Sequence, residues 1–119
     1  MTLKQLPWKL SVCRLKSMPD VPEGIFFLSR TDEEISLVCE TAAVPENAEA
    51  REDGWSAFRI EGQLDFSLIG ILSGISAVLA AEKIGIFAVS TFNTDYILVK
   101  EADFAPAMEA LQRAGYEIC

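Results

Sequence analysis

Short runs of alternating apolar and polar residues predict several β-strands in the second half of the chain. Trp55–Ile60 alternates as a strand does when one of its faces is buried. Ile86–Phe92 and Asp95–Glu101 are apolar arms joined by polar residues, a pattern that is typical of an antiparallel hairpin. Tyr116–Cys119 predicts a short closing strand at the C-terminal end.

A longer apolar stretch between these strands predicts the first helix. Phe66–Ala81 carries no charged residue, but it is shorter than the roughly 20 residues that a membrane span needs. We therefore expect a helix buried within the protein, from about Leu68 to Lys83. Asp65 and Ser67 are its N-cap candidates, and Gly85 is the expected stop.

A second helix is predicted over Asp103–Gly115. Asp103 is its expected N-cap, and Pro106 is expected in its first turn, where proline is tolerated. Met108, Leu111 and Gln112 follow the spacing of one helix face. The order strand, helix, strand, strand, helix, strand predicts an α+β fold of the βαββαβ ferredoxin-like type, with both helices on one face of an antiparallel sheet.

The chain also contains an internal similarity. Gly24–Glu40 aligns without a gap with Gly85–Glu101 at a displacement of 61 residues, and Ser11–Leu15 resembles Ser56–Ile60. Between the first two strands of the earlier copy lies only Lys16–Glu23, whose two prolines exclude a helix. We therefore predict tandem units: a degenerate first unit over residues 1–54, without its first helix, and a complete unit over residues 55–119.

Two details of the first unit are also predicted. Its second-helix position, Pro45–Asp53, is polar and is expected to be short or irregular. The strand Trp55–Ile60 is expected to end the first unit and to begin the second.

Composition excludes several classes of function. The 119 residues carry a formal net charge of −8, which argues against binding nucleic acid or anionic membranes. Histidine is absent, so the commonest general base and metal ligand is missing. The three cysteines form no paired motif and indicate reduced thiols in the cytoplasm. No signal peptide, metal, cofactor or catalytic activity is expected.

One segment carries a resemblance to a known family. "LAAEKIGIFAVSTFNTDYILVKEADF", Leu79–Phe104, is similar to the signature of tandem ACT-domain proteins, which include the CASTOR-type arginine sensors and small bacterial ACT-domain proteins. The resemblance implies a cytoplasmic regulatory protein that binds a small molecule, for which an amino acid is expected, as a homodimer or higher homo-oligomer. It implies no catalysis.

The resemblance also implies a ligand site. In ACT domains the loop from the first strand into the first helix, here Glu61–Gly70, holds a ligand together with a facing strand edge. That edge is the polar turn Ser90–Asp95, where Asp95 is expected to meet a ligand ammonium. The candidate ligand-binding residues are Leu64, Asp65, Phe66, Ser67, Ile69, Gly70, Ser90, Thr91, Phe92, Asn93, Thr94 and Asp95.

Two functions other than a sensor stay open at this point. The first is a structural dimerisation or partner-docking module without a ligand. The second is a small ferredoxin-like enzyme with Asp65 or Asp95 as general base. The turn residues also have a plain structural role, because Asn, Thr and Asp often bond their own backbone in turns. The structural alternative for Asp65 is a helix cap.

Overall fold

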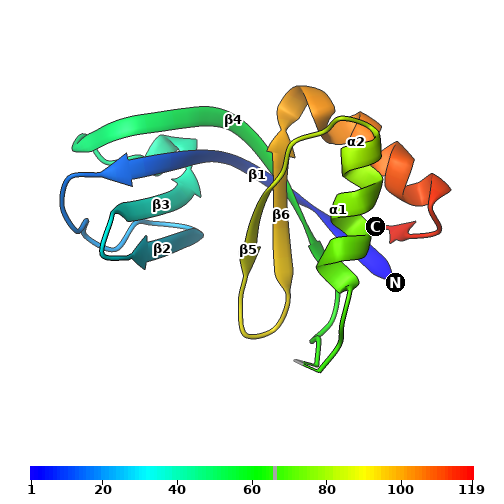
Figure 1. Cartoon of the computed structure of the whole chain (residues 1–119). Coiled ribbons are helices and arrows are strands. Elements are labelled where there is room, and N and C mark those ends of the chain that lie inside the picture. Colours follow the sequence, from blue (N-terminus) through cyan, green and yellow to red (C-terminus); the bar gives the residue numbers. More distant parts are fainter. Residues whose placement is uncertain (66) are drawn as a thin grey trace. The chain divides into compact units, whose positions relative to one another are not determined.

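The computed structural model describes residues 1–65 and 67–119 as strands, helices and short connections (Figure 1). In chain order the elements are β1 (Thr2–Leu15), β2 (Phe26–Arg30), β3 (Ile35–Glu40), the short 3-10 helix η1 (Thr41–Ala43), β4 (Ala48–Ile60), α1 (Ile71–Ala81), β5 (Phe87–Ser90), β6 (Asp95–Lys100), α2 (Glu101–Arg113) and β7 (Glu117–Ile118). Within the described residues, neither helix has the length and apolar character needed to cross a membrane.

The chain divides into two compact units, and both boundaries fall inside strands. Unit 1 comprises Met1–Pro7 and Ser56–Cys119, whereas unit 2 comprises Trp8–Trp55. Strands β1 and β4 therefore contribute one half to each unit. This division differs from the sequence-based boundaries of 1–54 and 55–119, because unit 1 also contains the N-terminal seven residues.

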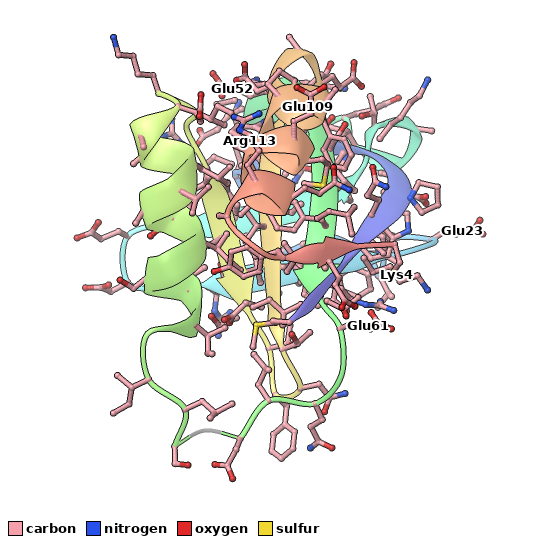
Figure 2. The ribbon with its side chains drawn as sticks, turned by 90° about the vertical axis from the view of Figure 1, so that its right-hand side faces the viewer. Lys4, Glu23, Glu52, Glu61, Glu109 and Arg113 are labelled. Atoms are coloured by element: carbon pink, nitrogen blue, oxygen red, sulfur yellow. The ribbon has the colours of Figure 1, made fainter. Side chains whose placement is uncertain are left out.

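Unit 1 is an α+β unit with its strands in the order β5-β6-β4-β1-β7. Helices α1 and α2 lie side by side on one face of these strands (Figures 1 and 2). The predicted α+β class, with an antiparallel sheet and two helices, is confirmed. The closing strand β7 pairs with the start of β1, in parallel, rather than with β4.

The core of unit 1 lies between the helices and the strands. Strands β1, β4 and β6 and both helices contribute side chains that are fully shielded from solvent, because apolar residues at strand period two and helix period three to four face the same layer. These side chains are Leu3 of β1, Phe58 and Ile60 of β4, Ile97 and Val99 of β6, Ile75 and Leu79 of α1, and Leu111 of α2. The labelled charged side chains Glu109 and Arg113 lie on the outside of α2 (Figure 2).

Both helices differ from their predicted ends. α1 begins after Gly70 rather than near Leu68, and α2 begins at Glu101, so Asp103 lies in its first turn and does not cap it. Pro106 consequently lies beyond the first turn. The stop of α1 is Lys83, which takes a left-handed conformation with a φ of 59°, and not Gly85.

The end of α1 follows a known capping geometry. The N–H of Ile84 donates to the carbonyl of Leu79 at 2.9 Å, and that of Lys83 donates to Ala80 at 2.9 Å. These two bonds satisfy carbonyl groups that a helix end leaves unpaired, as in a Schellman motif. Ile84 and Leu79 are both buried, which adds the apolar contact that accompanies such ends.

Unit 2 has its strands in the order β2-β3-β1-β4. Its small core contains Cys13, Leu15, Leu37 and Cys39, all at most 3% exposed. Residues 16–25 contain no helix, as the two prolines predict. The polar segment Pro45–Asp53, which was expected to be short or irregular, is mostly extended: Ala48–Asp53 belongs to β4, which is longer than the predicted strand. The short helix η1 lies before this segment.

The hairpins β2–β3 and β5–β6 have the same pairing at a displacement of 60 residues. Phe27 pairs with Val38, and Phe87 pairs with Leu98. Strands β3 and β6 also share one burial pattern along their six residues. The sequence alignment used 61, which is one residue off, and a one-residue slip places every side chain on the opposite face of a strand.

We expect Leu3→Ala to destabilise the protein by about 2–5 kcal/mol, the usual cost of truncating a buried leucine. Leu3 is fully buried in the core of unit 1, although it lies more than fifty residues before the next strand of that unit. Chemical denaturation followed by circular dichroism would measure the change. Lys4→Ala, at an exposed neighbouring position, is the control, and equal stability of the two variants would contradict the assigned core.

The three thiols should differ in reactivity. Burial raises the pKa of Cys39 to about 11 and also raises the pKa of Cys13, whereas Cys119 is exposed. Because the thiolate is the reactive form, we expect a disulfide reagent at pH 8 to label only Cys119 in the native protein. Unfolding should make the thiols of Cys13 and Cys39 accessible to the reagent. Rapid labelling of Cys13 or Cys39 before unfolding would show that this core is open.

Candidate functional site

Unit 1 contains a pocket of ≈ 340 Å³ at the end of its strands. Its lining residues come from the loop that leads from β4 into α1, from the first turn of α1 and from the turn between β5 and β6. Figure 1 shows this loop and this turn at the same end of the strands. The residues that line the pocket are Leu64, Asp65, Leu68, Gly70, Ile71, Leu72, Ser73, Ser90, Thr91, Phe92, Asn93, Thr94 and Asp95.

Two hydrogen bonds join the turn to the β4–α1 loop and to the end of β4. The backbone N–H of Leu64 donates to the carbonyl of Asn93 at 2.7 Å. The hydroxyl of Thr94 donates to the carbonyl of Ile60 at 2.7 Å, and Thr94 is only 5% exposed. A buried hydroxyl needs such a partner, so Thr94 fixes the turn against the end of β4.

The turn itself uses part of its polar side chains internally. The N–H of Thr91 donates to the carbonyl of Thr94 at 2.9 Å, and the Thr91 hydroxyl reaches the same carbonyl at 3.0 Å. Thr91 and Thr94 therefore have the structural role that turn chemistry predicts. Asp95 is half-buried, and its Oδ1 accepts a hydrogen bond from the Ser90 hydroxyl at 2.6 Å.

The N-terminus of α1 opens onto the pocket. Gly70, its N-cap residue, has a φ of 81°, a left-handed conformation that glycine adopts without strain. No side chain of the described residues caps this helix end. The first N–H groups of a helix lack partners within the helix and carry a partial positive charge. The backbone here, with Ile71 and Leu72 on the pocket wall, is therefore suited to an anionic group.

Asp65 shapes the loop rather than the helix. Its Oδ1 accepts the backbone N–H of Ser67 at 2.8 Å. This bond, together with the Ser67 hydroxyl, lowers the pKa of Asp65 below its ordinary value, so the carboxylate is ionised at neutral pH. Neither Asp65 nor Ser67 caps α1.

The charged residues of the described pocket lining are Asp65 and Asp95, and the lining includes no lysine or arginine. The two carboxylates lie on opposite walls, one on the loop and one at the start of β6. The pocket thus offers two negative charges, a helix N-terminus, several hydroxyl groups and the apolar side chains of Leu64, Leu72 and Phe92.

The structure gathers most of the predicted ligand-binding residues around this one pocket. Leu64, Asp65, Gly70 and the whole turn from Ser90 to Asp95 line it. Ser67 and Ile69 do not, and Ile69 is 94% exposed. Phe66 lies outside the described residues. Whether any of these residues contacts a ligand remains a prediction.

Four lining residues were missed by the sequence analysis. They are Leu68, Ile71, Leu72 and Ser73. The predicted helix began too early, at about Leu68, which placed Ile71–Ser73 in a helix interior instead of at its first turn. The glycine at position 70 was the available signal in the sequence, because glycine adopts the left-handed conformation that a sharp change of chain direction before a helix requires.

Comparison with known proteins agrees with this architecture. The family model of the ACT domain matches residues 50–113, which is more than half of the chain. The crystal structure of a protein from Agobacterium tumefaciens is 32% identical and superposes with a TM-score of 0.86, over 99% of this chain and 91% of that one. An aspartate kinase from Clostridium acetobutylicum shares the fold alone, at 15% identity and a TM-score of 0.65, over 94% of this chain and 33% of that one.

Curated relatives are similar to half of the chain. The cytosolic arginine sensor for mTORC1 subunit 1 of Homo sapiens and that of Bos taurus are each 43% identical over 60 residues, which is 50% of this chain. The match spans only 18% of the length of those relatives. The resemblance inferred from Leu79–Phe104 is thus confirmed by both the family model and these relatives. The chain belongs to the ACT-domain family.

Proposed function

We propose that the unit 1 pocket binds an amino acid and that the protein is a regulatory sensor rather than an enzyme. The observation that supports this most is the composition of the pocket lining. It combines a helix N-terminus without a side-chain cap with the carboxylates of Asp65 and Asp95 and an apolar wall. An amino acid presents the complementary groups: a carboxylate, an ammonium and a side chain.

Each group of such a ligand has a matching position. The ligand carboxylate would lie at the first turn of α1, where N–H groups converge. The ammonium would lie at Asp95, whose Oδ1 already accepts the Ser90 hydroxyl. Charge-assisted hydrogen bonds of this kind are the strong ones in a partly buried site. The apolar part of the ligand would pack on Leu72 and Phe92.

The charge balance of the pocket favours a ligand with an additional positive group. A neutral amino acid brings one ammonium to two carboxylates, and it leaves Asp65 without a counter-charge. A basic side chain would supply it. The names of the curated relatives, arginine sensors, agree with this preference.

A regulatory role is supported in the same way. The curated relatives carry the name of sensors, and the aspartate kinase with the same fold is described as an allosteric enzyme. The lowered pKa of Asp65 disfavours the alternative of a small enzyme, because a general base works best with a pKa near the operating pH. No cofactor is part of the proposal.

Asp95→Asn should weaken amino-acid binding by about 1–3 kcal/mol, the usual cost of losing a hydrogen bond to a charged group. A thermal-shift screen with the twenty amino acids would first identify the ligand, because binding to the native state raises its stability. Isothermal titration calorimetry would then compare the variant with the wild type. We expect arginine or lysine to give the largest stabilisation.

Glu109→Gln is the matched control, because Glu109 lies on the outside of α2 (Figure 2). This substitution removes one negative charge from the same unit, as Asp95→Asn does. Equal affinities of the wild type and Asp95→Asn would refute the role of Asp95. If none of the twenty amino acids stabilises the wild type, the sensor proposal fails. The pocket would then belong to a docking module without a ligand.

We also propose that the chain is a homodimer or higher homo-oligomer. Apolar side chains of the β4–α1 loop and of the β5–β6 turn are exposed, at 51% for Leu68, 94% for Ile69 and 71% for Phe92. Clustered exposed apolar residues mark interaction surfaces. Light scattering coupled to size-exclusion chromatography should give a molar mass of at least two chains at micromolar concentration. Ile69→Ser should lower the measured mass towards that of the monomer. A wild-type protein that stays monomeric would overturn the proposal.

A further inference from the structure

The loop between β1 and β2 carries a regular pattern of proline, apolar and basic residues (Figure 1). Residues 16–22 have the sequence Lys-Ser-Met-Pro-Asp-Val-Pro, and we name them the proline segment. The lysine stands three residues before the first proline, the second proline follows three residues later, and an apolar residue precedes each proline. This spacing is that of PxxP segments, which aromatic-lined grooves bind in the polyproline II conformation.

The backbone of the proline segment is restricted to extended conformations. Proline holds its own φ at about −65°, and it drives the preceding residue towards the β or polyproline II region. These two effects act on Met18 and Pro19, and again on Val21 and Pro22. In agreement, residues 18–22 form no helix, strand or turn.

Burial along the proline segment repeats every three residues. Pro19 and Pro22 are half-buried. The residues beside and between them, Met18, Asp20 and Val21, are exposed. Polyproline II has three residues per turn, so this repeat is the one expected when one edge of such a helix rests on the protein. The segment therefore presents two apolar side chains one turn apart, and they are exposed at 48% for Met18 and 82% for Val21.

The half-buried prolines are accessible from one side. A hollow of ≈ 420 Å³ lies between the proline segment and the chain that follows β3. Pro19 and Pro22 line it together with Ala43 and Pro45. An aromatic side chain of a partner can enter this space and pack on the proline rings, which is how polyproline II segments are recognised.

The proline segment is also held in place by its neighbours. It follows β1 directly and leads into β2. Near its start, the Asn47 side-chain amide donates to the Ser17 hydroxyl at 2.9 Å. A partner that binds a segment held in this way loses less conformational entropy than one that must order a free peptide.

Lys16 supplies the charge of the proline segment at its N-terminal end. It is exposed, and it forms no ion pair within the described part of the chain. It precedes Pro19 by one polyproline II turn. Carboxylates at one end of a partner's groove would pair with it and fix the direction in which the segment binds.

We propose that the proline segment is a docking site for a partner domain of the SH3 type, whose groove is lined by aromatic side chains and bears carboxylates at one end. The aromatic rings pack on Met18, Val21 and the two prolines, and the carboxylates pair with Lys16. The docking site belongs to unit 2, and it shares no residue with the pocket of unit 1.

Titration of purified ¹⁵N-labelled SH3 domains with the full-length chain tests the proposal. The domains are chosen because they prefer ligands in which the basic residue precedes the prolines. Amide and indole signals of their aromatic groove should shift and saturate. Lys16→Gln and Val21→Ser should each raise the dissociation constant about fivefold or more, as is typical of residues that anchor an interface.

Two control variants make the assignment specific. Lys9→Gln removes an exposed charge from β1 outside the proline segment, and Asp20→Asn changes the exposed position between the two apolar-proline pairs. Neither should weaken binding. All four substitutions lie at exposed positions, so the midpoint of thermal unfolding should stay that of the wild type.

A free peptide of residues 14–24 provides the comparison for presentation by the fold. It should bind no more tightly than the folded chain, because the fold holds the segment in place. The proposal is overturned if no domain binds the wild-type chain or if the domains bind the peptide and not the chain. It is also overturned if Asp20→Asn weakens binding as much as Val21→Ser does.

Discussion

Two long strands that run through both units are the constraint on which the rest of the structure depends. β1 and β4 each place one half in unit 1 and the other half in unit 2. The two strands are neighbours in the sheet. In unit 1 the N–H of Glu61, the residue after β4, donates to the carbonyl of Thr2 at 2.9 Å, and in unit 2 the Ser11 hydroxyl donates to Asp53 at 2.5 Å. A change of strand register at one end would therefore shift side chains in both cores.

The pocket in unit 1 depends on this constraint through Ile60. The last residue of β4 places its side chain in the core and offers its carbonyl to the hydroxyl of Thr94. The position of the polar turn thus follows from the end of a strand that starts in the other unit. The neighbouring residue Asp95 is then held at the pocket by β6 and by Ser90.

The parts of the fold that local pattern determines were predictable. The hairpin β5–β6 and the absence of a helix over residues 16–25 follow from alternation and proline. The gathering of the Ser90–Asp95 turn with the β4–α1 loop was implied by the resemblance to ACT domains, and not by local pattern. The role of the first ten residues was not predictable in this way. Thr2–Pro7 pairs with strands that lie far away in sequence, and Pro7 interrupts the pattern of its own strand.

The alignment of the two hairpins shows a different limit. Identical residues favoured a displacement of 61, whereas backbone pairing and burial give 60. Short apolar strands contain many similar residues, so one-residue slips cost few identities, although they exchange the buried and exposed faces. Burial, which is a property of the assembled sheet, distinguishes the two. The Asp95 of unit 1 consequently corresponds to Ile35, and not to Glu34.

The two ends of α1 have a consequence for the motions of unit 1. α2 carries Glu101 and Asp103 in its first turn and Arg113 in its last, which complements the helix dipole, whereas α1 has no such charges. Neither helix has a side-chain N-cap, but α1 is followed by Lys83, whose left-handed conformation usually costs about 1–2 kcal/mol. Transient opening of unit 1 should therefore begin at α1, and its amide hydrogens should exchange with solvent before those of α2. A molecule held at the start of α1 would slow that exchange, so the occupancy of the pocket would be transmitted as a change in the lifetime of one helix rather than as a change of shape.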